Sequence, residues 1–326
     1  MKVIFDKKQT LFQVFSALVV FAVLYFSYSA DNLHRLKSEA SARNGIVWLL
    51  SKKDAMPPEE AVVVFGKIYR MVKDKDMALA LKNAIKEKNL ELVRIEPPQD
   101  YSDQKFLQWE NLGPIVNELL FRKCFGEDYQ KHAKKLGDFA QENWEKLFSG
   151  HGRASRKLIV SYLLNELGLE FRSQWEAAKE QVLSRQLNLQ NPLNLDGIAY
   201  LYDLTHIIYT ESDYLGRYLP AQEFSKEAAI SRKTLATFSS VGELDFLTAD
   251  VLSELVVVLK VLRREDGWQI KKIQEKLIAM QNQDGYWGGL EDDSDNAKIH
   301  HTSVAAQALV EFLEMPRQGE SYCVEF

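Results

Sequence analysis

The second half of the chain alternates apolar and polar helical segments, and this alternation constrains the fold more than any other feature. Strongly apolar helices are expected to begin near Lys157, Ile198, Leu247 and His300, at intervals of about 41, 49 and 53 residues. More polar amphipathic helices are expected between them, at 174–186, 223–238 and 268–280. A period of about 40 to 50 residues that contains two helices indicates an array of helical repeats.

An apolar helix that alternates with a polar one predicts two layers, because an inner helix is buried on all sides and an outer helix on one face. Apolar residues recur at helical spacing earlier in the chain too, in segments 62–71, 77–86, 106–121, 129–148 and 157–167. Strand-like alternation is scarce, so the predicted fold class is all-α. Open solenoids share this pattern, and periodicity alone therefore leaves the closure of the array into a ring undecided.

A glycine-rich turn separates the last two predicted helices. Leu277, Gln281, Gly285 and Trp287 follow the order L-x3-Q-x3-G-x-W. This spacing resembles the repeat of the terpenoid cyclases, which are rings of paired helices. His300-His301-Thr302, expected at a helix start, resembles the histidine-threonine pair that opens an inner helix of protein prenyltransferase β subunits, where the histidine binds zinc. The resemblance implies an (α/α) toroid of paired helices and a metal site.

The resemblance covers roughly residues 194–314. Within it, LTHIIYTESDYLG and HHTSVAA also resemble helical-toroid domains of bacterial peptide natural-product pathways, a likeness that pairs His206 with His301 and brings no established activity. In the ring enzymes the tryptophan packs against a helix end and the glutamine bonds free backbone groups, which implies structural roles for Trp287 and Gln281.

The chain also departs from these families. It lacks the Asp-x-Cys pair of the zinc prenyltransferases, the D-x-D-D motif of squalene-type cyclases and the D-D-x-x-D motif of class I terpene synthases. The resemblance therefore does not imply prenyl transfer or cyclisation.

Polar residues interrupt three of the apolar helices. His206 lies among apolar neighbours, and Asp250 and Glu254 are four residues apart and so share one helix face. Two buried carboxylates at that spacing repel and need a cation, a histidine or a shared proton. His206, Asp250, Glu254 and His301 together predict a zinc or iron site with one position open for substrate or water.

Structural interpretations of the same residues remain open from sequence. Asp203, three residues before His206, could form an ordinary buried pair with it. Asp250 could cap a helix that begins at Thr248, which would leave Glu254 in solvent.

No residue from Gln9 to Ala30 is charged. As a helix this run is about 33 Å long, enough to cross the core of a bilayer. It predicts a single transmembrane anchor at 9–30 after a short tail at 1–8; a cleaved signal peptide is the alternative, although its apolar region is usually shorter. The flanking basic residues slightly favour an N-terminus inside, which predicts that the bulk of the protein is extracytoplasmic.

These observations predict an anchor followed by a helical (α/α) toroid domain at 35–326, and they leave open whether 35–150 forms a separate helical subdomain. The net charge of −5, from 41 basic and 46 acidic residues, does not favour nucleic acid binding. The predicted function is a metal-dependent enzyme acting on a hydrophobic or peptide substrate, because a ring would enclose an apolar cavity. The alternative is a non-catalytic binding or scaffold protein of an envelope complex.

Overall fold

The computed structural model describes residues 7–92, 94–149, 154–185, 195–265, 267–289 and 294–317, with no description of the side chains of 7–27, Glu110 and Leu195. Within these ranges every regular element is helical. The one extended pairing among them is an isolated antiparallel bridge between Val72 and Phe312. The predicted all-α fold class is confirmed.

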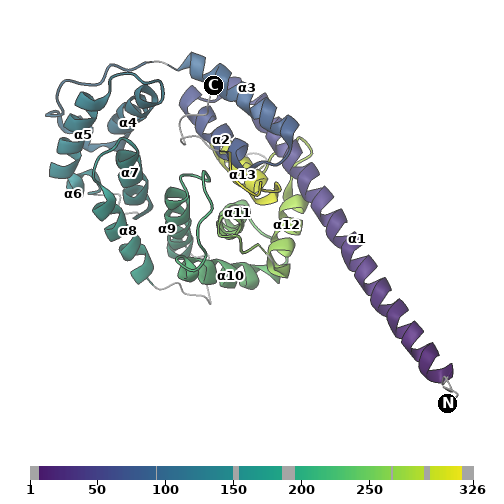
Figure 1. The fold of residues 1–326 in the computed structure, drawn as a ribbon. Coiled ribbons are helices and arrows are strands. Elements are labelled where there is room, and N and C mark those ends of the chain that lie inside the picture. The colour runs from purple at the N-terminus through teal and green to yellow at the C-terminus, as the bar shows by residue number, and fades with distance from the viewer. Residues whose placement is uncertain are drawn as a thin grey trace.

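The helices follow the expected segments closely (Figure 1). In chain order they are α1 (Lys7–Ser51), η1 (Lys53–Ala55), α2 (Pro58–Met71), α3 (Lys75–Glu91), η2 (Gln104–Leu107), α4 (Trp109–Cys124), α5 (Gln130–Glu142), α6 (Trp144–Leu147), α7 (Ala154–Glu166), α8 (Arg172–Ser184), α9 (Leu195–Glu211), α10 (Ser225–Ser239), α11 (Phe246–Val261), α12 (Trp268–Met280) and α13 (Asp295–Leu309).

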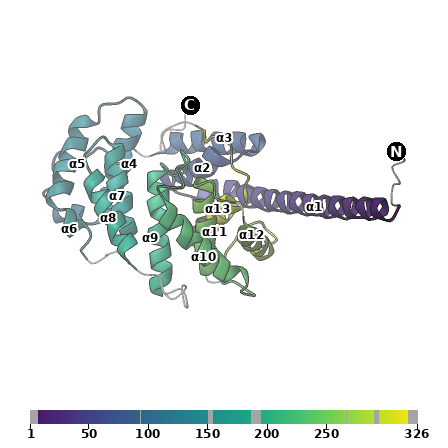
Figure 2. The same ribbon diagram turned by 60° about the horizontal axis from the view of Figure 1, so that its bottom comes forward.

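The helices pack in two layers. Helices α7, α9, α11, α13 and α2 lie side by side in that order, so that α2 follows α13 in space although it is far from it in sequence. Helices α8, α10, α12, α1 and α3 cover them from outside (Figures 1 and 2). Every residue of α11 from Thr248 to Val261 is buried, whereas α12 buries one face. This difference matches the alternation of apolar and polar helices in the sequence.

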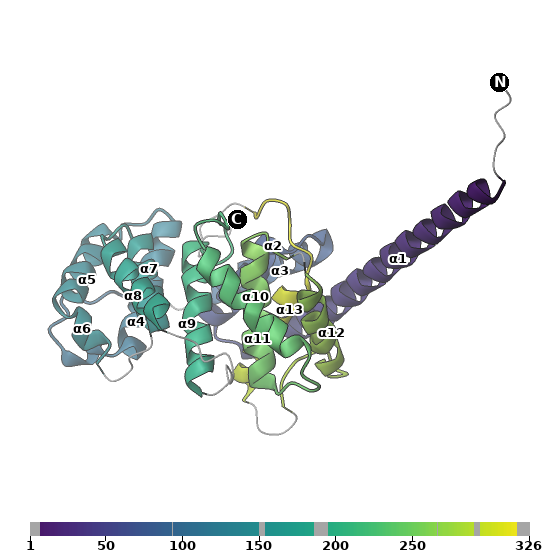
Figure 3. The same ribbon diagram turned by 90° about the horizontal axis from the view of Figure 1, so that it is seen from below.

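Helix α1 joins the body only with its second half. From Asp31 onward it packs against α12 and α13, while its first half extends away from all other helices (Figure 3). No helix in the described part of the chain combines the length and apolar character needed to cross a membrane. Most of the anchor predicted at 9–30, up to residue 27, consists of residues whose side chains lie outside the described part of the chain.

The segment after α13 contacts the connection between α2 and α3. The backbone N–H of Leu313 donates to the carbonyl of Met71 at 2.9 Å, next to the bridge between Val72 and Phe312. The guanidinium of Arg317 donates to the carbonyl of Val72 at 2.7 Å. The segment after α13 therefore closes over the C-terminal end of α2.

The turn between α12 and α13 has the structural role that its motif predicts. Trp287 is 1% exposed, and its indole N–H donates to the carbonyl of Leu277 at 2.7 Å. The amide of Gln281 donates to the carbonyls of Ser41 at 2.8 Å and Gly285 at 2.7 Å. Gly285 has a φ of 97°, and a Cβ there would lie 2.8 Å from a backbone oxygen of α1. The turn thus locks α1 against the last helix pair.

The start of α13 differs from the prediction. The helix begins at Asp295, and the Ser294 hydroxyl caps it by accepting from the N–H of Ala297 at 3.3 Å. This serine cap, followed by an acidic residue in the first turn, stabilises a start earlier than the histidine pair. His300 and His301 therefore lie inside the helix, and the hydroxyl of Thr302 accepts from the N–H of Trp287 at 3.1 Å.

Candidate functional site

Two buried carboxyl groups lie on the inner helix α11. Asp250 and Glu254 are each 2% exposed. The cap of this helix is Asp245, whose carboxylate accepts from the N–H of Thr248 at 2.7 Å. The alternative in which Asp250 caps the helix and Glu254 faces solvent is therefore wrong.

Asp250 has an incomplete set of donors. Its Oδ2 accepts a hydrogen bond from the Tyr202 hydroxyl of α9 and lies 3.3 Å from Nε2 of His300 on α13. Its Oδ1 is buried and has no hydrogen-bond partner. Burial lowers the pKa of His300, but the hydrogen bond to Asp250 and the charge of Asp250 outweigh it and raise the pKa overall. Asp250 therefore favours the charged form of the His300 imidazole, which is about half exposed.

Glu254 is poised to exchange a proton near neutral pH. Its Oε2 accepts from the hydroxyl of Thr205 on α9 at 2.5 Å. Burial, followed by the negative charge of Asp250, raises the pKa of Glu254 to about 7, and the charges of His300 and Lys67 only partly oppose this. A carboxyl group with such a pKa is present in both protonation states at neutral pH, as a general acid or base requires.

Lys67 on α2 adds a positive charge that the sequence analysis missed. Its Nζ lies 4.7 Å from the centre of the Tyr214 ring and 5.8 Å from that of Tyr209. Burial lowers the pKa of Lys67, and the charge of Glu254 opposes that shift. The available signal was one lysine inside the apolar run VVVFGKIYR, an arrangement that leaves a charge on a buried helix face.

His206 on α9 is held as a neutral imidazole. Its Nδ1 lies 2.7 Å from the carbonyl of Tyr202, so Nδ1 carries the proton and Nε2 is an acceptor. Burial lowers the pKa of His206 to about 4. Nε2 is therefore available to a proton donor or a metal at neutral pH.

A buried tyrosine hydroxyl completes the inner cluster, by which we mean Lys67, Tyr202, Thr205, His206, Tyr209, Asp250, Glu254 and His300. The hydroxyl of Tyr209 is buried and has no hydrogen-bond partner. Burial, followed by the charges of Glu254 and Asp250, raises the pKa of Tyr209, so it stays a donor. A buried polar group without a partner costs about 1–3 kcal/mol. A ligand with matching polar groups would recover that free energy at Tyr209 and at Oδ1 of Asp250.

The predicted metal residues do not form a coordination set as they stand. No three of His206, Asp250, Glu254 and His301 have ligand atoms within 4.8 Å of one another. The histidine that contacts Asp250 is His300, the residue before the predicted one. Asp250 and Glu254 lie together on buried α11, and the metal site of His206, Asp250, Glu254 and His301 stays a prediction.

One group of carboxylates elsewhere does have metal-like spacing. Oxygens of Asp54, Glu87 and Glu91 lie within 4.8 Å of one another, and all three residues are exposed. Two lysines already neutralise them: Lys53 pairs with Glu87, and Nζ of Lys88 lies 2.6 Å from Glu91. This surface group is an ion-pair network.

Asp203 has a structural role. It is 1% exposed, and its Oδ1 accepts from the N–H of Ser155 at 2.8 Å, in the first turn of α7. Its Oδ2 accepts from Arg185 at 2.7 Å. N–H donors from other elements occupy both oxygens of Asp203. These contacts therefore do not support the alternative of an ordinary buried pair between Asp203 and His206.

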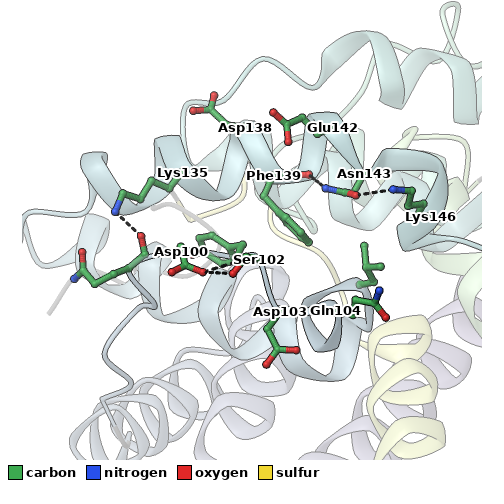
Figure 4. Close-up of a pocket in the computed structure, with 13 residues that line it drawn as sticks. Asp100, Ser102, Asp103, Gln104, Lys135, Asp138, Phe139, Glu142, Asn143 and Lys146 are labelled. Carbon is green, nitrogen blue, oxygen red and sulfur yellow. Dashed lines mark hydrogen bonds between the residues drawn. The ribbon is translucent and has the colours of Figure 1, made fainter.

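Recesses outside the inner cluster include one of about 450 Å³ between α1 and the start of α3, and two others. One of these, of about 500 Å³, is lined by the segment around η2 and by α5, and its wall includes the charged residues Asp100, Asp103, Lys135, Asp138, Glu142 and Lys146 (Figure 4). These elements contribute nothing to the inner cluster, and the recess is open surface.

The other recess, of about 410 Å³, is apolar. It lies between the start of α2 and α4 and includes Leu92, Trp109 and Phe121. Glu60, in the first turn of α2, is near enough to His300 for that charge to lower its pKa, although burial raises the pKa overall. The apolar recess and the inner cluster thus share the N-terminal part of α2.

Compared with known proteins, the chain matches no family model, no curated protein and no solved structure. The resemblance to terpenoid cyclases and prenyltransferases therefore stays a prediction that rests on its motif residues.

Proposed function

We propose that this chain is a membrane-anchored (α/α) toroid enzyme that transfers protons to and from a hydrophobic or peptide substrate at the inner cluster. The observation that carries the proposal is Glu254, a carboxyl group with a pKa of about 7 within the buried stretch of α11 from Thr248 to Val261. Such shifted groups concentrate at functional sites. Beside it, Asp250 and Tyr209 each present a buried polar atom without a partner.

Each group of the cluster has a chemical role in this proposal. Glu254 is the general acid or base. Lys67 stabilises negative charge that develops on the substrate, because its amine is held in a region of low dielectric constant. His300, whose side chain is 52% exposed, adds a charge that solvent screens. His206 accepts a hydrogen bond at Nε2, and Tyr209 donates one. Together they offer a donor, an acceptor and a proton carrier to one bound molecule.

The surroundings of the cluster support the substrate class. Its helices are largely apolar, as the run of buried leucines and valines in α11 illustrates. The apolar recess beside the start of α2 offers about 410 Å³ for a nonpolar group. Pockets of this size with few polar groups bind molecules that are largely apolar.

The proposed ring needs one further inner helix, and α4 is placed to supply it. Helix α4 contacts α7 at one end of the row of inner helices. Residues of α4 and of the start of α2 line the same apolar recess. With α4 opposite α2, six inner helices would close the toroid around the cluster.

Two features of the chain support the proposed location. The uncharged run at 9–30 forms the first half of α1, which no other helix covers. Cys124 is disulfide-bonded, and structural disulfides persist in oxidising compartments. Both agree with a body held outside the cytoplasm by an N-terminal anchor.

A metal-dependent reaction is the second candidate. Oδ1 of Asp250 lacks a partner, and Nε2 of His206 is an acceptor, so both suit zinc or iron. Ligand atoms of Glu254 or His301 would have to move toward them. Elemental analysis of the full chain purified in detergent tests this: about one equivalent of zinc or iron supports a metal site, and a content below about a tenth excludes it.

Labelling with dicyclohexylcarbodiimide tests the proton-transfer site. This apolar reagent attacks protonated carboxyl groups in apolar surroundings. We expect Glu254 of the full chain to be modified, with a yield that falls by half near pH 7 as the carboxyl ionises. Peptide mass spectrometry locates the adduct. Asp203 is the matched control, because it is equally buried and both of its oxygens are already hydrogen-bonded.

Two outcomes decide between enzyme and scaffold. Labelling of Glu254 that disappears in Glu254→Gln means that small apolar molecules reach a protonated carboxyl in the inner cluster. If Glu254 stays unlabelled from about pH 5 to 8 while exposed carboxylates react, the interior is closed and the scaffold interpretation replaces the enzyme.

A further inference from the structure

Helices α1 and α12 run side by side in the same direction with a constant register. Three polar contacts join them, and the residue numbers differ by 240 in each: Asp31–Lys271, His34–Gln274 and Ser41–Gln281. The same offset places Tyr28 level with Trp268, the first residue of α12. The start of α12 therefore lies beside the last residues of the uncharged run.

No spacer separates that run from the body. The run ends at Ala30, and Asp31 already contacts α12 through Lys271. Helix α1 is continuous from Lys7 to Ser51. At 1.5 Å per residue, Asp31 lies about 2 Å beyond the end of the run. If 9–30 crosses a membrane, the body cannot be held away from its surface.

Large apolar side chains are exposed at this end of the body. Tyr28 is 69% exposed, Trp268 60% and Met315 72%. Met315 follows Glu314, whose carbonyl accepts from Arg263 in the turn that leads to α12. Tryptophan and tyrosine favour the boundary between lipid headgroups and hydrocarbon, where the ring is apolar and its polar atom stays hydrated.

Several charged residues at this end already have partners. Lys271 pairs with Asp31, and Lys272 pairs with Glu275. The guanidinium of Arg263 lies 4.1 Å from the centre of the Tyr218 ring. The proposed contact is therefore apolar and aromatic, and a surface of zwitterionic lipid with no net charge suits it.

From this geometry we infer that the end of the body that carries the start of α12 rests on the lipid bilayer, with Trp268 in the interface. The inference depends on the anchor in the proposed function and adds a second contact with the membrane. Because the amide of Gln274 donates to the carbonyl of Ala308 at the end of α13, that inner helix has its C-terminal end toward the lipid. A substrate dissolved in the bilayer would approach the body from this side.

Fluorescence quenching by brominated phosphatidylcholine tests the contact. The full chain is reconstituted into vesicles with and without the brominated lipid, and tryptophan emission is compared. We expect Trp268→Phe to lose more than half of the quenched emission. Trp144→Phe, on α6, is the matched control and should keep it. Trp48 lies on α1 about 26 Å beyond Asp31 along the helix axis, too far to report on the interface.

The outcomes separate this inference from the anchor. If the wild-type chain is released from membranes by alkaline carbonate, the anchor fails and the contact fails with it. If the chain stays embedded but Trp268→Phe is quenched as strongly as the wild type, the contact alone is wrong. Quenching that persists at about 0.5 M salt supports the apolar contact, and loss of quenching at that salt overturns it in favour of a charge-driven one.

Discussion

Two buried carboxylates on neighbouring inner helices have opposite surroundings. Asp203 on α9 is 1% exposed, and N–H donors from Ser155 and Arg185 occupy both of its oxygens. Asp250 on α11 is 2% exposed, and both of its partners share one oxygen while Oδ1 has none. One carboxylate ties three elements together, and the other leaves an acceptor open in the interior.

The difference shows that burial alone does not mark a functional carboxylate. A complete donor set offsets the desolvation of Asp203, and its contribution is to stability. Asp250 and Glu254 share too few donors, so the cost of burial appears as a raised pKa of Glu254. A candidate site is therefore distinguished by buried carboxyl groups that have too few hydrogen-bond donors.

Trp287 has no titratable group, so its substitution gives a pH-independent loss of stability against which the carboxylate variants can be compared. Trp287→Ala should lower the free energy of unfolding by about 3–5 kcal/mol, because the indole is 1% exposed and its removal leaves a cavity. The loss should be equal at pH 5.5 and pH 8 in denaturant titrations of the full chain. A loss within about 0.5 kcal/mol, typical of surface sites, would contradict the structural role of the turn.

Glu254→Gln should raise the free energy of unfolding instead of lowering it, and the size of this change should depend on pH. A raised pKa means that the folded chain binds more protons than the unfolded chain between pH 4.5 and about 7, so the stability contributed by Glu254 falls as pH rises through that window. Gln cannot ionise and still accepts from Thr205. The free energy of unfolding of the variant should therefore exceed that of the wild type by as much as about 3 kcal/mol at pH 8. At pH 4.5 the two should differ by less than about 1 kcal/mol.

The variant must be compared with the wild type at each pH, because neighbouring groups act in the other direction. The pKa of His206 is lowered to about 4, so the folded chain binds fewer protons there and gains stability as pH rises from about 4 to 6.5. Lys67, whose pKa is lowered by burial, acts with the same sign at higher pH. A stability difference that stays constant from pH 4.5 to 8 would show that the pKa of Glu254 is not raised.

Asp203→Ala should destabilise the chain by about 2 kcal/mol. It leaves the N–H of Ser155 unpaired at the start of α7, while Arg185, with 39% of its side chain exposed, can turn to solvent. Asp203→Asn keeps an acceptor for Ser155 and should lose less. If both variants match the wild type in denaturant titrations, Asp203 is no more structural than Asp250, and the comparison fails.

The smallest expected effect separates two tyrosines of the inner cluster. Tyr209→Phe removes a buried hydroxyl that has no partner, so stability should stay equal or rise by up to about 1 kcal/mol. Tyr202→Phe removes a donor from Asp250 and should lower stability. Equal losses in thermal unfolding would mean that the hydroxyl of Tyr209 is already paired.

Sequence reasoning succeeded where one helix settles the outcome. The apolar run of α11 predicts burial on all sides, and Asp250 and Glu254 are buried with it. The resemblance of Gln281, Gly285 and Trp287 to the ring-enzyme motif implies structural roles, and the hydrogen bonds of Gln281 and Trp287 agree with them. In both cases residues close together in sequence are enough to locate the feature.

It failed where several helices must be placed relative to one another. His300 and His301 differ by about 100° around α13, and the choice between them depends on how that helix is rotated against α11. Lys67 comes from α2, about 190 residues before Glu254, and only the packing of α2 beside α13 brings it near the cluster. No local pattern encodes that adjacency.

The adjacency of α2 and α13 also constrains the order of synthesis and folding. The first helices of the body, α1 and α2, pack against α13, and the segment after α13 pairs with the end of α2. Ala42, Ile46 and Leu49 on α1 are fully buried in the complete body. Until α13 leaves the ribosome, α1 lacks one of the helices that cover it, so the emerging chain carries a partly exposed apolar face while α2 to α12 are made. Folding of the body is therefore tied to the synthesis of α13, and long-range contacts of this kind make it slow.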